Sequence, residues 1–361
     1  MKYLFIAPFP PPVTGNSLAV EVLYNNLSQS NDVKRLNLSK SSMQNGFTSL
    51  KRVFEIFTIY YKLIFEVRKS DIIYFTISES IAGNLKDLII FLLSYSKLDN
   101  MYIHLHGGAG YKVILSSKHP FLKKLNSYFL KKLKGIIVLG ETHKHIFEHI
   151  IDNDKLHIVP NFSENKFFIN TNELEIKYSK RNKLKVLFLS NLIEGKGYKE
   201  LVAAYKMLGP KYIDRIEINF AGAFESDASQ KEFLLSISGY TNMNYHGIVY
   251  GEKKKEMLFE SHVFCLPTYY PYEGQPISIL EAYSSGCIVL TTNHSGIFDI
   301  FKNNINGYEV IKKSSDSIKD ILEQLVDNLE GSKRIAKFNI SEAWNKYTVE
   351  KHLNNIKFIL K

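Results

Sequence analysis

The sequence is poor in cysteine: its two cysteines, Cys265 and Cys287, each lie in an apolar stretch that predicts a buried strand. This scarcity excludes a disulfide-stapled scaffold and is typical of proteins from a reducing cytoplasm. No Cys/His spacing suited to zinc is present. No stretch approaches the ~20 apolar residues that a membrane-spanning helix needs. We therefore expect a cytoplasmic protein.

The sequence also lacks a secretory signal and a nucleic-acid-binding module, which limits the classes of partner to expect. The apolar run at residues 2–7 stops at Pro8, so it is too short for a secretory signal. The 361 residues carry a net charge of +10, which predicts an anionic partner such as a nucleotide or a membrane surface. No nucleic-acid-binding module is recognisable, so we do not expect nucleic acid among the partners.

Strand and helix patterns alternate twice along the chain, from Lys2–Pro8 to His157–Pro160 and again from Lys185–Ser190 to Cys287–Thr291. This alternation predicts an α/β protein with two parallel-sheet domains and a cleft between them. The polar stretch Ser163–Lys183 lacks an apolar period and predicts the linker. The expected parts are domains at 1–163 and 184–339, a linker at 164–183 and a final helix at 340–361.

Two carboxylates, Glu273 and Glu281, stand eight positions apart around Pro276. Proline suits the first turn of a helix, which places Glu273 in a loop and Glu281 on the following helix. Glu281 would share an apolar stripe with Ile277 and Leu280. A carboxylate there is costly unless it is bound, and sugar hydroxyls would bind it through charge-assisted hydrogen bonds. The alternative is that Glu281 lies at the edge of the stripe, in water.

With the residues that follow, this segment resembles the retaining glycosyltransferases of the GT-B fold, in the large group called family 4. The similarity lies in Glu273–Ala282, Gly286–Thr291, Ser295-Gly296 and Asn306-Gly307-Tyr308, although Cys287-Ile288 and Ser295 depart from the family pattern. Residues 71–75, 103–107 and 158–161 also match family motifs in the expected order, so the resemblance covers nearly the whole chain. The resemblance implies two Rossmann-like, doubly wound domains facing a central cleft, with the C-terminal helix crossing back to the first domain.

Lys196 lies between two glycines at the start of a predicted helix, where a cation opposes the helix dipole. This placement suggests a cation held for a ligand, and the alternative is a solvated lysine. The resemblance matches Lys196 to the lysine that contacts the donor pyrophosphate. It implies that Glu281 holds the ribose and Glu273 a hydroxyl of the donor sugar. The expected donor-binding residues are Gly15, Asn16, Asn191, Lys196, Glu273, Gly274, Gln275, Pro276, Ile277 and Glu281.

Further candidate residues lie in the loop before the first helix and in two other predicted loops. Gly15 precedes the first helix, where backbone N–H groups can approach an anion. Asn16 and Asn191 stand where the family has a glycine and an arginine. His106 matches the family histidine beside the reactive sugar, with His104 as a neighbouring alternative. The expected catalytic residues are therefore Lys196, Glu273 and His106.

The pair Asp152 and Asp154 has the spacing of a metal site in a different glycosyltransferase fold, but it lies in a polar turn and is rejected here. Enzymes of the GT-B type stabilise the leaving diphosphate with cationic side chains and helix N-termini. We therefore expect no metal and no cofactor, only a UDP- or GDP-sugar as the donor.

The segment Phe121–Lys134 places four apolar residues on one stripe and most of its lysines off it, as in an interfacial helix. The stripe consists of Leu122, Leu125, Phe129 and Leu133. The alternative is that this stripe packs into the first domain. Because the chain is basic, we expect contact with an anionic membrane surface, on the inner face of the cell membrane.

The sequence thus predicts a metal-independent, retaining hexosyltransferase that moves a sugar from a nucleoside diphosphate to an acceptor hydroxyl. The expected acceptor is a glycan or lipid-linked glycan in surface polysaccharide synthesis. Two alternatives stay open. One is a catalytically weak GT-B subunit that binds nucleotide and supports a partner, since Asn16 and Asn191 replace family residues. The other is a sugar-nucleotide epimerase, which would need an acid/base set that the sequence does not show.

Overall fold

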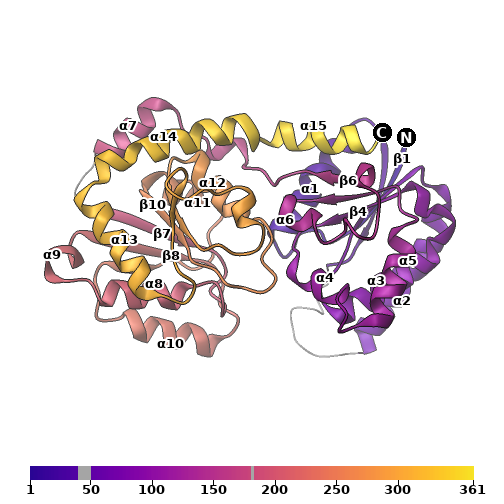
Figure 1. Cartoon of the computed structure of the whole chain (residues 1–361), viewed down its shortest axis with the longest axis horizontal. Coiled ribbons are helices and arrows are strands. Elements are labelled where there is room, and N and C mark those ends of the chain that lie inside the picture. The colour runs from indigo at the N-terminus through magenta and orange to yellow at the C-terminus, as the bar shows by residue number, and fades with distance from the viewer. Residues whose placement is uncertain (40–49, 180–182) are drawn as a thin grey trace. The chain divides into compact units, whose positions relative to one another are not determined.

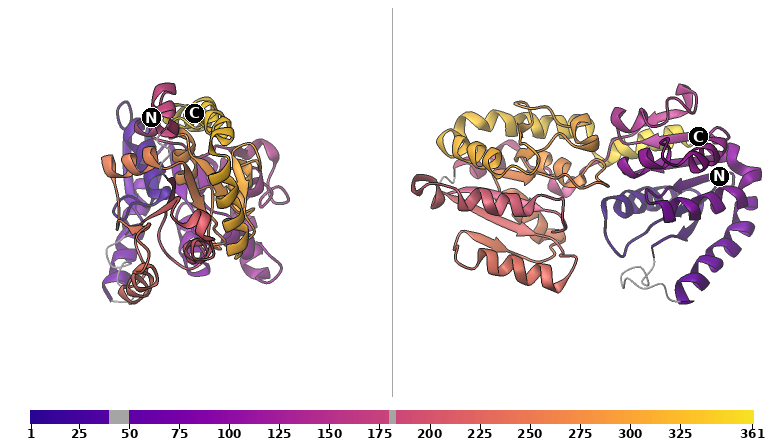
Figure 2. Two further views of the ribbon diagram at one scale, coloured as in Figure 1. Left: turned by 90° about the vertical axis from the view of Figure 1, so that its left-hand side faces the viewer. Right: turned by 60° about the horizontal axis from the view of Figure 1, so that its bottom comes forward.

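The computed structural model describes residues 1–39, 50–179 and 183–361. The chain forms two compact units, Met1–Pro160 with His352–Lys361, and Asn161–Lys351. Each unit has one six-stranded parallel sheet with helices on both faces (Figures 1 and 2). The predicted α/β architecture with two doubly wound sheets is therefore confirmed.

The sheet of the N-terminal unit has the strand order β2-β1-β3-β4-β5-β6. The sequence analysis missed β2, a polar edge strand in which only Leu36 is buried. The strands are β1 (Lys2–Ala7), β2 (Asp32–Asn37), β3 (Ile72–Thr76), β4 (Met101–Leu105), β5 (Gly135–Val138) and β6 (Leu156–Ile158). The helices are α1 (Gly15–Leu27), α2 (Leu50–Lys69), α3 (Ile81–Leu93), η2 (Tyr95–Asn100), α4 (Ala109–Ile114), α5 (Pro120–Leu130), α6 (Glu141–Lys144) and η3 (Asn153–Lys155).

Alternating side chains of these strands supply two separate cores. Leu4 and Ile6 of β1 belong to the apolar cluster that also contains the buried residues of α2, α3 and α5. Phe5, between them, lies on the other face and meets Tyr24 of α1 at 5.8 Å between ring centroids. One face of this sheet is thus covered by α2, α3 and α5.

The sheet of the C-terminal unit has the order β12-β11-β10-β7-β8-β9. Its strands are β7 (Leu184–Leu189), β8 (Ile216–Ala221), β9 (Met243–Tyr245), β10 (Val263–Leu266), β11 (Ile288–Thr291) and β12 (Gly307–Glu309). Its helices are η4 (Asn165–Phe167), α7 (Thr171–Ser179), α8 (Tyr198–Lys206), α9 (Pro210–Ile213), α10 (Asp227–Ile237), α11 (Gly251–Glu260), α12 (Ile277–Ser284), η5 (Ser295–Asp299), α13 (Ser315–Asp327) and α14 (Leu329–Lys346).

The stretch predicted as a linker, residues 164–183, is instead part of the C-terminal unit. It contains η4 and α7, whose Phe167, Leu174 and Tyr178 are buried in the core of that unit. The Tyr178 hydroxyl donates to the carbonyl of Gly286 at 3.2 Å. The prediction failed because the described residues of this stretch that enter the core, Phe167, Ile169, Leu174 and Tyr178, are irregularly spaced among polar residues and give no detectable period.

The C-terminal helix predicted over 340–361 is two helices. The last turn of α14 ends at Lys346, and α15 runs over Val349–Ile359 after a break at Tyr347 and Thr348. From His352 onward the chain belongs to the N-terminal unit. There the Nδ1 atom of His352 forms a hydrogen bond with the carbonyl oxygen of Pro160 at 2.7 Å.

The apolar stripe predicted to be interfacial on Phe121–Lys134 faces inward. Phe129 and Leu133 are buried in the core of the N-terminal unit, and Leu122 and Leu125 pack against it. The alternative reading of this stripe is therefore the correct one. Among the described residues, no helix has the length and apolar character required to cross a membrane.

The packing of α7 predicts how the C-terminal unit responds to truncation. Leu174 is buried, so Leu174→Ala should lower the free energy of unfolding by about 2–4 kcal/mol. Ile176→Ala on the exposed side of the same helix is the matched control and should change it by less than about 1 kcal/mol. Urea denaturation followed by intrinsic fluorescence measures both. Equal effects of the two substitutions would contradict the assignment of α7 to this core.

Candidate functional site

The strand order of the C-terminal unit reverses between β7 and β10, which are neighbours in the sheet. In open α/β sheets, ligands bind outside the carboxyl ends of the strands at such a point. The loop after β7 carries Lys196, and the loop after β10 carries Thr268 and Glu273. The fold therefore brings these three side chains to one edge of one sheet.

Lys196 and Glu273 form an ion pair at this edge. Lys196 Nζ donates to Glu273 Oε2 at 2.7 Å, and the side chains are only 13% and 8% exposed. The Thr268 hydroxyl donates to the same carboxylate oxygen at 2.8 Å. Nζ also lies 4.9 Å from the ring centroid of Tyr270. The lysine is thus held by a carboxylate and an aromatic face, a cation fixed in position and largely removed from water.

The two glycines beside Lys196 are required by the backbone. Gly195 has φ +88° and Gly197 has φ +86°, in the left-handed region that L side chains rarely adopt. A Cβ atom on Gly197 would also stand 2.5 Å from the carbonyl oxygen of Pro267. The loop can therefore approach the segment after β10 only with glycine here, and this approach brings Lys196 to Glu273.

Glu281 lies fully buried on α12, with its stripe neighbours Ile277, Leu280 and Ser284 also buried. Lys254 of α11 donates to Glu281 Oε1 at 2.7 Å. Oε2 makes no hydrogen bond within the described part of the chain. The sequence analysis missed Lys254. The only local indication was a run of three lysines, which does not show which of them meets a carboxylate. Glu281 is thus half satisfied and keeps one buried oxygen that can accept a hydrogen bond.

Of the other expected residues of this unit, Gly274 and Gln275 are buried near Glu273, and Asn191 is exposed. Gln275 Oε1 accepts from the backbone N–H of Asn161 at 2.8 Å. Pro276 is the residue immediately before α12, whose first residue is Ile277. Asn191 lies in the loop after β7, as Lys196 does.

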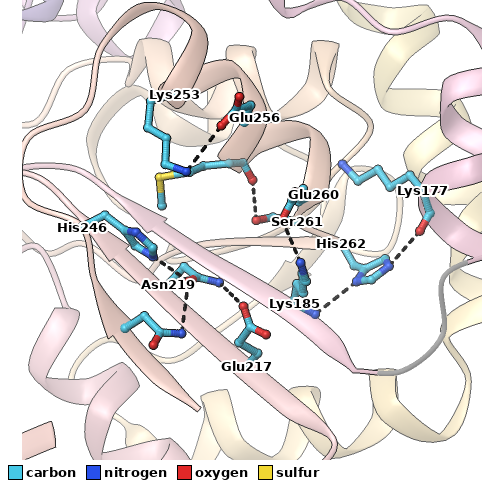
Figure 3. A network of polar contacts seen from close by, with 12 residues as sticks. Lys177, Lys185, Glu217, Asn219, His246, Lys253, Glu256, Glu260, Ser261 and His262 are labelled. Carbon is cyan, nitrogen blue, oxygen red and sulfur yellow. Dashed lines mark hydrogen bonds and ion pairs between the residues drawn. The ribbon is translucent and has the colours of Figure 1, made fainter. Parts of the chain in front are cut away.

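A polar network lies at the opposite, amino end of these strands, and Figure 3 shows the part of it around Lys177, His262 and Lys185. Lys177 is fully buried and its Nζ donates to the carbonyls of Leu258 and Ser285, at the C-terminal ends of α11 and α12. Such a cation complements both helix dipoles. Burial lowers the pKa of Lys177.

His262 joins α7 to β7 in the same network (Figure 3). Its Nδ1 accepts from the backbone N–H of Lys185 at 3.1 Å, and its Nε2 lies 3.1 Å from the carbonyl of Lys177. These partners require the neutral tautomer with the proton on Nε2. Burial lowers the pKa of His262 to about 4, so the ring stays neutral near pH 7.

The N-terminal unit holds the remaining expected residues. Its strand order reverses between β1 and β3, and Gly15 and Asn16 open the helix that follows β1. Thr14 caps this helix by accepting from the N–H of Ser17 at 3.1 Å. Asn16 Oδ1 is shielded from solvent and has no hydrogen-bond partner among the described residues. One acceptor at this helix start is therefore available for a ligand.

His106 follows β4, and its ring lies against that of His104, with centroids 3.9 Å apart and the ring planes tilted by 33°. His104 Nδ1 pairs with the Tyr74 hydroxyl at 2.6 Å, which marks His104 as structural. Both ring nitrogens of His106 are shielded from solvent and make no hydrogen bond within the described ranges. Burial, with a smaller contribution from His352, lowers the pKa of His106 to about 3. A neutral imidazole with two free nitrogens can bind a hydroxyl group.

Glu79, which the sequence analysis missed, contacts the loop after His106. It follows β3, at the point where the strand order reverses, and a Cβ atom on Gly107 would stand 1.7 Å from Glu79 Oε2. Burial raises the pKa of Glu79 to about 7, and backbone N–H groups of Gly110 and Gly108 oppose the rise. No motif marked this residue, because only the fold places it against the glycine turn.

The rejected aspartate pair lies at the surface, with Asp152 and Asp154 exposed around the short helix η3. Within residues 1–39, 50–179 and 183–361, no group of three or more His, Cys, Asp or Glu side chains is arranged to hold a metal ion. The metal-independent reaction stays a prediction.

Comparison with solved structures decides the fold. Anabaena HepE in complex with UDP and glucose has a TM-score of 0.74 at 15% identity, covering 100% of this chain and 99% of that chain. Sucrose-phosphate synthase from Thermosynechococcus elongatus has a TM-score of 0.73 at 12% identity, covering 99% and 98%. The fold is GT-B-like. At these identities the likeness extends to the fold alone.

Sequence comparison adds a family match for the C-terminal unit. The profile of the family described as "Glycosyl transferases group 1" matches residues 170–341. The capsular polysaccharide biosynthesis glycosyltransferase CapM of Staphylococcus aureus is 25% identical over 54% of this chain and 52% of its own length. CapH of the same organism is 27% identical over 41% and 42%. The chain thus matches about half the length of these curated relatives, and the matches support a glycosyltransferase.

The buried pair on α11 and α12 predicts an asymmetric response to mutation. Lys254→Met would leave Glu281 as a buried charge without its cation, so it should lower the free energy of unfolding by about 3 kcal/mol. Lys253→Met, at an exposed position on the same helix, should have little effect. The double variant Lys254→Met/Glu281→Gln should regain part of the loss, as chemical denaturation can measure. Equal losses at positions 253 and 254 would refute the pairing.

The raised pKa of Glu79 predicts a pH dependence. A carboxyl group whose pKa rises on folding stabilises the folded state fully below about 4.5 and loses this contribution as the pH rises through about 7. Glu79→Gln should therefore be more stable than wild type at pH 8, by on the order of 2–3 kcal/mol, and close to it at pH 4.5. The histidines with lowered pKa values are unchanged in both proteins, so the difference between them isolates Glu79.

The control for this experiment is Glu141→Gln, an exposed glutamate at the start of α6. Because Glu141 is exposed and does not contact the glycine turn, this variant should not reproduce the gain in stability that Glu79→Gln shows at pH 8. A flat difference for Glu79→Gln would show that the Glu79 carboxyl titrates normally.

Proposed function

We propose that this protein is a retaining, metal-independent glycosyltransferase that uses a nucleoside diphosphate sugar. The observation that carries the proposal is the Lys196–Glu273 pair at the carboxyl edge of β7 and β10. This edge is where an open α/β sheet binds its ligand, and a fixed cation there suits a diphosphate.

The chemistry of the C-terminal unit supports a nucleoside diphosphate sugar as the donor. Glu281 has one buried carboxylate oxygen without a partner in the described part of the chain, and a ribose hydroxyl would donate to it. Lys196 would meet the diphosphate, with Glu273 holding both the lysine and a hydroxyl of the donor sugar. UDP is the first candidate nucleotide, because Anabaena HepE, which shares the fold, was crystallised with UDP and UDP-glucose.

In the proposed reaction, the bond between the anomeric carbon and the diphosphate oxygen breaks as the acceptor hydroxyl approaches from the same face. The acceptor oxygen forms the new bond, and its proton passes to the departing diphosphate. Negative charge develops on the diphosphate, so Lys196 supplies the main stabilisation of the transition state. His106, neutral and with both nitrogens free, orients a hydroxyl of the sugar or of the acceptor.

The proposed donor sugar is a hexose, and the proposed acceptor is a lipid-linked glycan in the synthesis of a surface polysaccharide, on the inner face of the cell membrane. The names of the curated relatives support this choice, since CapM and CapH are both described as capsular polysaccharide biosynthesis glycosyltransferases. The net charge of +10 agrees with work at an anionic surface.

A second candidate is a nucleotide-binding subunit with weak activity. It is favoured by Asn191, an exposed neutral residue on the loop that also carries Lys196. The lack of a second cation at this position would weaken stabilisation of the leaving group without preventing nucleotide binding. Labelled donors distinguish the two functions, because the transferase turns the donor over by transfer or hydrolysis, whereas the weak subunit binds the nucleotide with little or no turnover of the donor.

Replacing the fixed cation tests the proposal directly. Lys196→Ala should lower the rate of sugar transfer or donor hydrolysis by at least ~100-fold, the scale for losing one positioned group at a developing anion. Lys199 is an exposed lysine three residues further on, and Lys199→Ala should leave the rate within about twofold of wild type.

A thermal-shift screen with UDP, GDP, ADP and CMP identifies the nucleotide before these rates are measured, because binding stabilises the folded state.

Two results would overturn parts of this proposal. Equal rates for Lys196→Ala and wild type would remove Lys196 from the reaction. Inhibition by EDTA that Mg²⁺ or Mn²⁺ reverses would show that a metal stabilises the leaving group.

A further inference from the structure

The N-terminal unit exposes an apolar surface on three adjoining helices, α2, α3 and α5. Helix α3 packs against both α2 and α5, and the inner sides of all three cover one face of the sheet (Figure 1). Their outer sides should therefore be polar in a protein that is surrounded by water. We call the exposed outer side of these helices the α2–α3–α5 face.

Helix α3 departs most clearly from that expectation. Its exposed side chains are Ile81, Ala82, Leu85, Ile89 and Leu92, all apolar. The four large ones recur at helical spacing and are between 42% and 63% exposed. The two charged residues of α3 do not lie among them, since Asp87 is buried and Lys86 pairs with it at 3.2 Å. The exposed side of α3 is therefore apolar, and its polar residues Asn84 and Asp87 are buried instead.

The neighbouring helices extend the apolar surface. On α2, Phe57, Tyr61, Ile64 and Phe65 are exposed, and the rings of Tyr61 and Phe65 lie 5.0 Å apart. On α5, Phe121 and Tyr128 are exposed. Exposed apolar side chains gathered on three adjoining helices are uncommon on a protein that works alone in water, and large patches of this kind mark a contact with a partner or a membrane.

The charges of these helices select the partner. The described side chains of α2, α3 and α5 include six cations and two carboxylates, of which Asp87 is buried. The cations are Lys62, Arg68 and Lys69 of α2, Lys86 of α3, and Lys123 and Lys124 of α5. Apolar side chains flanked by lysines complement a layer of acyl chains beneath anionic headgroups. A second copy of the same face would instead bring cations against cations.

Aromatic side chains near the end of α5 fit the same partner. The hydroxyls of Tyr95 and Tyr128 hydrogen-bond each other at 2.7 Å, and Lys132 Nζ lies 5.0 Å from the Tyr128 ring centroid. Tyrosine combines an apolar ring with a polar tip, which suits the boundary between headgroups and acyl chains.

We propose that the α2–α3–α5 face is a membrane-docking surface that inserts the exposed side chains of α3 below the headgroups of an anionic bilayer. The inference builds on the proposed function, which places the acceptor at a membrane. It names a surface different from the inward stripe of α5. Docking would bring the enzyme to lipid-linked acceptors and requires no step of sugar transfer.

Vesicle co-sedimentation tests this surface. Wild type should bind vesicles of phosphatidylcholine with phosphatidylglycerol and bind less as salt is added, because the lysines are screened. The triple variant Leu85→Gln/Ile89→Gln/Leu92→Gln should bind at least about tenfold more weakly. The matched control is Leu234→Gln/Leu235→Gln/Ile248→Gln, which alters exposed apolar residues of the C-terminal unit and should bind as wild type does.

Charge is tested separately, with Lys62→Gln/Lys123→Gln/Lys124→Gln. At low ionic strength this variant should bind the anionic vesicles on the order of 100-fold more weakly than wild type, because each lysine near the surface contributes about 1 kcal/mol. Its remaining binding should depend less on salt. Vesicles of phosphatidylcholine alone should bind wild type weakly. The control replaces three exposed lysines of the C-terminal unit, Lys199, Lys206 and Lys231, with glutamine.

Three results would contradict the proposed docking surface. The first is no binding of wild type to anionic vesicles at low salt, and the second is an equal loss of vesicle binding in the triple variant and its control. The third is a wild-type dimer that the triple variant does not form, with no vesicle binding by either protein. The last would assign the face to a second copy of the chain. Nucleotide thermal shifts on the same variants separate this inference from the proposed function. Vesicle binding without any nucleotide response would refute the function and leave the surface standing.

Discussion

A carboxylate that stays charged inside a protein needs a cation or hydrogen-bond donors beside it, and two carboxylates of the C-terminal unit are paired with lysines. Glu273 meets Lys196 across neighbouring loops, and Glu281 meets Lys254 across two helices. Both pairs join separate elements of the unit, with 77 positions between Lys196 and Glu273 and 27 between Lys254 and Glu281. Oε2 of Glu281 makes no hydrogen bond among the described residues, so this pair keeps an acceptor that the proposed donor would use.

The surrounding structure holds these pairs in place from both ends. At the carboxyl edge, the positive φ angles of Gly195 and Gly197 let the loop approach the chain after β10. At the amino edge, Lys177 binds the last carbonyls of the helices that carry Lys254 and Glu281. The helix α7 therefore contributes to the site without containing any residue that touches it. In the N-terminal unit, Glu79 has a comparable place, since its carboxyl group contacts the glycine turn after His106.

The sequence predicted the main framework because strong signals were local. Alternating strand and helix patterns identified two parallel sheets, and the spacing of Glu273, Pro276 and Glu281 placed one carboxylate in a loop and the other on a helix. Weak or non-local signals were missed: the polar edge strand β2, the helix α7, and the partners Lys254 and Glu79. The stripe of α5 was ambiguous, since an apolar face has the same spacing whether it meets a core or a membrane.

What the sequence determined by itself is therefore the set of elements and the residue types available for chemistry, because periodicity and turn residues act over short distances. Only the tertiary structure decided which charges meet. The order of strands brings β7 beside β10, and this adjacency turns Lys196 and Glu273 from separate motif residues into one ion pair. The same holds for the outer side of α3, whose exposure follows from how the helix packs on the sheet, and which local sequence cannot reveal.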